Sequence, residues 1–165
     1  MQQTITHIYP IAASRYWQEL YFDKHFTEQL YLQGLGCLHF QLLAEGTFPD
    51  YSRTIRSQPK LMVPKTLQKI LGPSLSYTEK GQLTLAENRY SFSITPSALA
   101  NKIHISGTQC IRPTQENQTE STITIDFSVR MFGIGKIVEK FILQSTIENQ
   151  QNAALFTKKW LSTKT

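Results

Sequence analysis

Residues 103–160 read IHISGTQCIRPTQENQTESTITIDFSVRMFGIGKIVEKFILQSTIENQQNAALFTKKW, and this stretch decides the fold. Its first half alternates apolar and polar residues, with one apolar face formed by Ile103, Ile105, Gly107 and Ile111 and a second by Ile123, Ile125, Phe127, Val129 and Met131. This period of two predicts two long strands joined by a polar turn at 114–119. From Ile134 to about Trp160 the apolar residues recur at helical spacing, which predicts one helix about 40 Å long. A sheet followed by so long a helix predicts that the helix covers the sheet and encloses a pocket.

The residues before this stretch predict five further strands and three short helices. We expect strands at 4–9, 38–44, 51–58, 75–85 and 90–94. Short helices are expected from about Ser14, from Asp23 as an N-cap, and from Pro64 to Leu71. Short turns between successive strands favour antiparallel pairing. The sequence therefore predicts an α+β fold in which a curved seven-stranded antiparallel sheet wraps around a long C-terminal helix, with two short helices between strands 1 and 2.

The composition is that of a globular protein, and residues 1–165 are expected to form a single domain. The net charge of +5 comes from 17 scattered basic residues without a dense block. We therefore expect no nucleic-acid binding, and at most a weak, transient attraction to anionic membrane surfaces. No signal peptide or apolar run of membrane-spanning length is seen, and Cys37 and Cys110 are expected to face outward as free thiols. These features predict a cytoplasmic protein.

Four short motifs, in this order, resemble a known family. They are Val63-Pro64 to Leu71-Gly72, Tyr77-Thr78-Glu79, Gly135-Lys136-Ile137-Val138-Glu139, and Phe156 to Trp160-Leu161. With these motifs and this order of elements, the chain resembles the START-like (SRPBCC, helix-grip) superfamily of the birch pollen allergen and the polyketide cyclases. Within it, the chain is most similar to a bacterial family of unknown function. It departs from that family at Lys80-Gly81, where a Trp often follows the acidic residue of the strand.

The resemblance implies a hydrophobic pocket and no particular reaction. On the faces inferred from alternation, ten residues are expected to line or close it: Phe40, Leu42, Ile55, Tyr77, Phe92, Ile105, Phe127, Val129, Phe141 and Ser145. The middle of the long helix is polar at Ser145, Asn149 and Asn152. This polar turn either faces a partly solvated cavity or is exposed to solvent.

Arg53 and Glu79 are the candidate polar residues of the pocket. Arg53 shares a strand face with Ile55, and Glu79 shares one with Leu83, so the two can meet inside. The pair would hold the polar head of a ligand or form a structural ion pair. Alternatively, Lys80-Gly81 marks a bulge that turns Glu79 to solvent.

Catalytic and metal signatures are absent from the sequence. The four histidines lack metal-ligand spacing, and no nucleophile elbow occurs. We therefore expect no cofactor, no metal and no catalytic residue. The favoured function is non-catalytic binding or transport of a lipid or other hydrophobic small molecule. The alternatives are a cyclase- or hydratase-like enzyme using Glu79, Tyr77 or Arg53, and a module that contacts a protein or a membrane surface.

Overall fold

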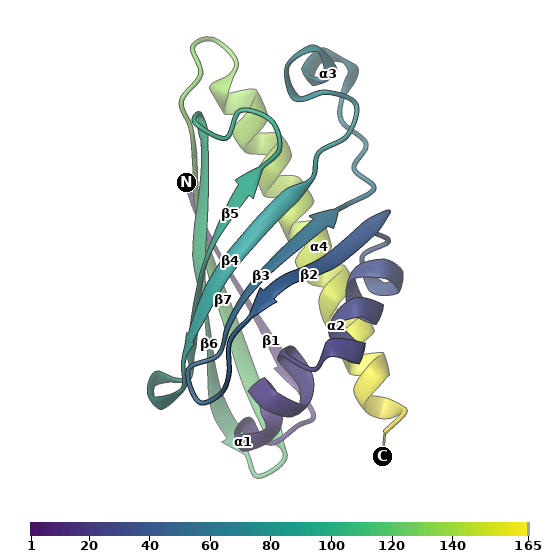
Figure 1. Ribbon diagram of the computed structural model, residues 1–165, viewed down its shortest axis with the longest axis vertical. Helices are drawn as coiled ribbons and strands as arrows, with labels where there is room; N and C mark the ends of the chain where they lie inside the picture. The colour runs from purple at the N-terminus through teal and green to yellow at the C-terminus, as the bar shows by residue number, and fades with distance from the viewer. Residues whose placement is uncertain (165) are drawn as a thin grey trace.

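The computed structural model describes residues 1–164 and contains a seven-stranded antiparallel sheet and a long C-terminal helix (Figure 1). The strands are β1 (Gln2–Tyr9), β2 (His39–Glu45), β3 (Ser52–Gln58), β4 (Tyr77–Thr84), β5 (Arg89–Pro96), β6 (Ile103–Gln115) and β7 (Gln118–Val129). The helices are α1 (Ala13–Arg15), α2 (Lys24–Gln29), α3 (Lys65–Leu71) and α4 (Gly135–Ser162), with the short turns η1 (Tyr16–Tyr21), η2 (Leu30–Gly34) and η3 (Leu85–Glu87). The predicted fold class is confirmed.

The sheet has the strand order β1-β7-β6-β5-β4-β3-β2, and every neighbouring pair is antiparallel. Successive strands pair along the chain from β2 to β7, as the short turns between them predict. The exception is β1, which pairs with β7 and places Gln2 opposite Asp126. A bulge interrupts the register of the edge strand β2 between Leu42 and Ala44.

Helix α4 runs unbroken for 28 residues, as the spacing of its apolar residues predicts. It crosses behind the sheet along most of the molecule (Figure 1). Its buried positions include Val138, Ile142 and Ala154, which belong to the hydrophobic core. Near its start, the Glu139 carboxylate accepts a hydrogen bond from the backbone N–H of Val129 at 3.2 Å, so the helix begins close to the end of β7.

Two short helical segments join β1 to β2, and each ends in a π-helical turn. Asp23 caps the second segment, as expected, by accepting a hydrogen bond from the Phe26 N–H at 2.7 Å. The first begins at Ala13 rather than Ser14, because Ala12 holds the N-cap position and no side chain caps this end. The turns η1 and η2 carry Tyr21 and Tyr31 into the space under the sheet.

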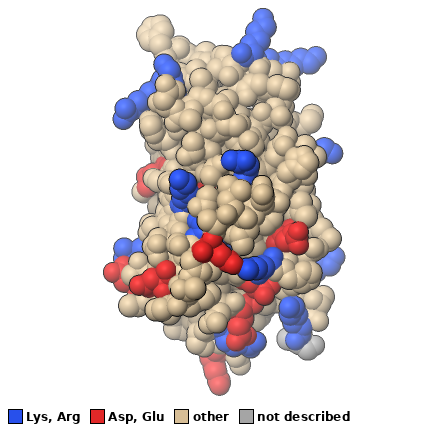
Figure 2. Space-filling view, in the orientation of Figure 1, with Lys and Arg blue, Asp and Glu red and all other residues tan. Residues whose placement is uncertain are grey.

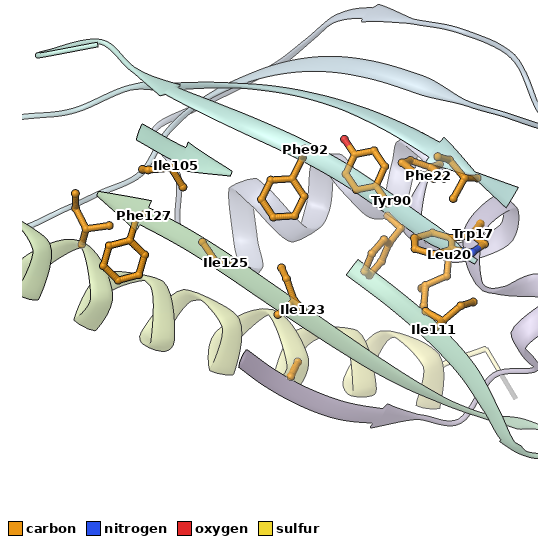
Figure 3. Close-up of a cluster of buried hydrophobic side chains, with 14 of the residues drawn as sticks. Trp17, Leu20, Phe22, Tyr90, Phe92, Ile105, Ile111, Ile123, Ile125 and Phe127 are labelled. Carbon is orange, nitrogen blue, oxygen red and sulfur yellow. The ribbon is translucent and has the colours of Figure 1, made fainter. Parts of the chain in front are cut away.

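The hydrophobic core lies between the sheet, α4 and the segments that join β1 to β2 (Figure 3). Figure 3 shows Phe92, Ile105, Ile123, Ile125 and Phe127 projecting from their strands on the side where α4 lies. Within residues 1–164, no helix is long and apolar enough to cross a membrane.

Candidate functional site: a cavity between the sheet and α4

A cavity of about 230 Å³, partly open to solvent, lies between the sheet and α4. Seven of the twelve residues predicted to bind a ligand lie in its wall: Arg53, Ile55, Tyr77, Glu79, Phe92, Ile105 and Ser145. They come from β3, β4, β5, β6 and α4, so the inferred inner faces of these elements meet around one space.

The other five predicted residues lie outside the wall. Phe40 and Leu42 pair with Ser57 and Ile55, which places them on the inner side of the edge strand β2. Phe40 stacks on Tyr31, with ring centres 4.6 Å apart, and so packs behind a residue of the wall. Where α4 starts against β7, Phe127 is buried in packed core, and Val129 and Phe141 pack against that core.

The Arg53 guanidinium is buried in the wall among aromatic rings. Its central carbon lies 5.0, 5.1 and 5.5 Å from the ring centres of Tyr21, Phe22 and Tyr90. Only 5% of the side chain is exposed. It makes a long contact of 3.4 Å to Glu79 Oε1, and its Nε is buried without a partner. A charged donor group is therefore held in the cavity wall with part of its hydrogen-bonding capacity unused.

Glu79 faces inward beside Arg53. The register of β4 with β3 and with β5 continues through Glu79, Lys80 and Gly81, so the alternative of a bulge there is excluded. Glu79 Oε1 also accepts a hydrogen bond from the Tyr90 hydroxyl at 2.8 Å. Gly81 makes room for this ring, because a Cβ at position 81 would lie 2.0 Å from the Tyr90 oxygen.

Four tyrosine hydroxyls in the wall have no hydrogen-bond partner among residues 1–164: those of Tyr9, Tyr21, Tyr31 and Tyr77. Burial raises the pKa of each, in Tyr77 to about 12. These phenols are therefore neutral at physiological pH and offer O–H donors to a molecule in the cavity.

A second polar cluster lies in the wall around Gln109. The Gln109 Nε2 donates to the Tyr16 hydroxyl at 2.7 Å and to Ser121 Oγ at 2.9 Å. Sequence reasoning missed this cluster. The signal was present, because Gln109 stands between Gly107 and Ile111 on an otherwise apolar strand face.

The polar turn of α4 lies partly in the cavity wall and is partly exposed to solvent. Ser145 and Asn149, with Thr146 and Gln150, line the cavity, whereas Asn152 is exposed.

The expectation that Cys37 faces outward is wrong, because Cys37 is buried and lines the cavity. Burial raises the pKa of its thiol to about 11. No group of His, Cys, Asp and Glu side chains within residues 1–164 is arranged to hold a metal ion.

Comparison with known proteins gives a family and a fold. A family model described as "Protein of unknown function (DUF2505)" matches residues 4–161. No curated protein matches the chain.

Solved structures with the same fold are similar over nearly the whole chain. The Zhui aromatase/cyclase from Streptomyces sp. R1128 superposes with a TM-score of 0.69 at 14% identity, covering 96% of this chain and 92% of that one. A START superfamily protein from Mycobacterium smegmatis gives 0.63 at 15% identity, covering 97% and 98%. Norcoclaurine synthase from Thalictrum flavum, in complex with dopamine and hydroxybenzaldehyde, gives 0.63 at 16% identity, covering 98% and 88%. The START-like, helix-grip resemblance of the sequence is confirmed at the level of the fold.

Proposed function

The chain belongs to the family of proteins of unknown function DUF2505, and we propose that it binds a small apolar molecule with a hydrogen-bond-accepting head group and carries it unchanged. The Arg53 guanidinium is the observation on which this proposal rests. Leaving buried donors unpaired costs about 1–3 kcal/mol each, and more where the group is charged. An acceptor of the ligand, such as a carbonyl or carboxylate, would satisfy Arg53 and the tyrosine hydroxyls around it.

The volume of the cavity sets the size of the ligand. A cavity of about 150 Å³ accepts benzene, and a water molecule takes about 30 Å³ of liquid. The 230 Å³ found here therefore suits a chain of roughly eight carbons or a molecule of one or two rings. This favours a medium-length acyl chain or an aromatic acid over a membrane lipid with two long chains.

Apolar residues provide the affinity in this proposal. Ile55, Phe92, Ile105, Ile123 and Ile142 contribute apolar wall, and buried apolar area is worth about 25 cal/mol per Å² before the costs of binding. The Gln109 cluster and the polar turn of α4 would hold any second polar group of the ligand. Such a wall with few convergent polar groups is typical of a small-molecule site.

Binding without reaction is favoured by the state of the ionisable groups. The Cys37 thiol has a raised pKa and is a poor nucleophile at neutral pH. Glu79 already accepts hydrogen bonds from Tyr90 and Arg53. The second candidate, a cyclase- or hydratase-like enzyme using Glu79 and Tyr77, is supported by the likeness to an aromatase/cyclase and by the inward position of both residues.

Calorimetric titration with octanoate and octylamine tests the head group, because the two share a chain and differ in the polar end. We expect octanoate to bind saturably and octylamine to bind at least about tenfold more weakly. The double variant Arg53→Met with Glu79→Gln, which leaves neither charge unpaired, should abolish the preference. Equal affinity for both probes in the wild type would contradict the role of Arg53.

A second pair of variants tests whether the probe enters the cavity. Ser145→Leu fills the space beneath α4, whereas Gln144→Leu adds the same side chain on the exposed side. Only Ser145→Leu should weaken octanoate binding. If the wild type binds no apolar probe saturably, the carrier proposal is wrong. If mass spectrometry finds that the probe has been chemically changed, the enzyme is favoured instead.

A further inference from the structure

Seven of the 17 basic residues, with a single acidic one, lie at the end of the molecule that carries α3. Figure 2 shows Lys and Arg, and no acidic side chain, on the visible face of this end. Three segments meet there: 59–74 around α3, 97–102 between β5 and β6, and 129–140 from β7 into α4 (Figure 1). The Arg130 N–H donates to the Lys102 carbonyl at 2.8 Å, which ties the last two together. We call these segments the basic end.

The charge of the basic end exceeds that of the whole protein. It holds seven exposed basic side chains and one acidic one, Glu139, for a formal charge of +6 against +5 for the chain. The seven are Lys60, Lys65, Lys69, Lys102, Arg130, Lys136 and Lys140. The Glu139 carboxylate accepts a backbone hydrogen bond from Val129. The remaining surface is therefore nearly neutral, and the protein has a strong charge asymmetry along its long axis.

The same end carries the two most exposed large apolar side chains among residues 1–164. Phe132, at the tip of the β7–α4 loop, is fully exposed, and Met62, just before α3, is 89% exposed. Ile137 is also exposed, in the first turn of α4. Neither Phe132 nor Met62 belongs to the core or packs against it. Their exposure therefore does nothing for the fold.

We propose that the basic end docks on the surface of an anionic lipid membrane, with Phe132 and Met62 inserted among the lipid head groups. Separate apolar tips surrounded by lysines suit a bilayer, into which each tip can insert on its own. A protein partner would be expected to meet a continuous apolar patch. Lysine and arginine near an anionic surface each strengthen binding about fivefold.

The wall of the cavity reaches this docked end. Pro59 and Leu61 belong both to the basic end and to the cavity wall. Docking would bring the cavity close to a source of apolar molecules, and this link alone rests on the proposed ligand binding. The docking surface itself stands on exposure and charge.

Co-sedimentation with vesicles tests the proposal. One set of vesicles is phosphatidylcholine alone, and the other contains about 30% phosphatidylserine. We expect binding only to the anionic vesicles, with a fall of tenfold or more between about 50 and 500 mM salt. Equal binding to both vesicle types, or none to the anionic ones at low salt, would overturn it.

Matched variants locate the surface. Phe132→Ser with Met62→Ser removes the apolar tips, and Lys65→Gln with Lys69→Gln removes two charges from α3. Each should weaken anionic-vesicle binding by about tenfold or more. The controls are Leu155→Ser and Lys158→Gln with Lys159→Gln, at exposed positions on the other half of α4. Losses in the controls as large as in the test variants would contradict the assigned surface.

Octanoate titration without vesicles separates this inference from the proposed function. The basic-end variants should bind octanoate as the wild type does. Vesicle binding by a protein that fails to bind octanoate would support docking and reject the carrier role. The reverse result would reject docking alone.

Discussion

At the scale of single residues, His7 links stability to pH. Its Nε2 is buried without a partner, on β1 next to Tyr9. Burial lowers the pKa of His7 below its usual 6.5, and the nearby Lys158 lowers it further. The unfolded chain therefore takes up a proton more readily than the folded one, and the stabilisation is lost as the pH falls below about 6.5.

We expect the wild type to lose more stability between pH 7.5 and 5.5 than His7→Gln, which keeps a polar side chain of similar size and does not titrate. Urea midpoints across this range measure the difference. Parallel curves for the two proteins would show that His7 has the same pKa in both states.

Gly81 is a second residue with a specific role, because the Tyr90 ring occupies the space above it. An added methyl group would meet the Tyr90 oxygen and ring at 2.0–2.6 Å. Gly81→Ala should therefore destabilise the protein by about 1–3 kcal/mol or more. The neighbouring Lys80→Ala, on the exposed face of β4, should change little. Adding Tyr90→Leu to Gly81→Ala should recover part of the loss, and full additivity in a double-mutant cycle would contradict the clash.

At the scale of elements, β6 allows a comparison between a residue that lines the cavity and one in packed core. Ile105 and Ile111 share a strand face and are both buried, but only Ile105 lines the cavity. Ile111→Ala should cost about 2–5 kcal/mol, as in a packed core, and Ile105→Ala should cost clearly less. Denaturant unfolding measures both. Equal losses would mean that the space beside Ile105 is packed rather than open.

The long strands and α4 were predictable because the spacing of apolar residues differs between strands, where it is two, and helices, where it is about 3.6. The alternation in 103–131 and the helical spacing after Ile134 give type, face and near-correct ends. Alternation fixes which face a residue occupies but not how far the opposite layer lies from it. The alternation therefore predicts Phe127, Val129 and Phe141 in the cavity wall, although α4 starts close to β7 there and these residues belong to packed core or pack against it.

Two tyrosines of the cavity wall, Tyr21 and Tyr31, were missed from the sequence, whereas Tyr77 was predicted. Helical spacing groups Tyr21 with Leu20 and Tyr31 with Leu30, but it does not tell a face that borders a cavity from one in packed core. Tyr21 and Tyr31 reach the cavity from the turns η1 and η2. Arg53 and Glu79 could be named as candidates from the sequence, because both lie on strands with regular alternation, and the continuous register of the two strands places them side by side.

At the scale of the whole molecule, a ligand should stabilise the fold. Binding at a hundred times the dissociation constant adds about 2.7 kcal/mol, which for a chain of this size raises the Tm by roughly 5–10 °C. We expect octanoate to produce this shift in the wild type, and a much smaller one in Ser145→Leu.

Calorimetry of the protein without ligand should show one cooperative unfolding transition, since one core is shared by sheet and helix. Two resolved transitions would contradict the single domain expected over residues 1–165.

The pairing of β1 with β7 bears on how the chain is made. Strand β1 leaves the ribosome before β7, and Gln2 pairs with a residue that lies 124 positions later in the chain. Until β7 is synthesised, Ile5 and Tyr9 have no sheet to cover them. Contacts so distant in sequence slow folding and prolong exposure of unpaired strands. The nascent chain therefore keeps an unpaired first strand until β7 emerges, and this is the interval in which a chaperone would matter most.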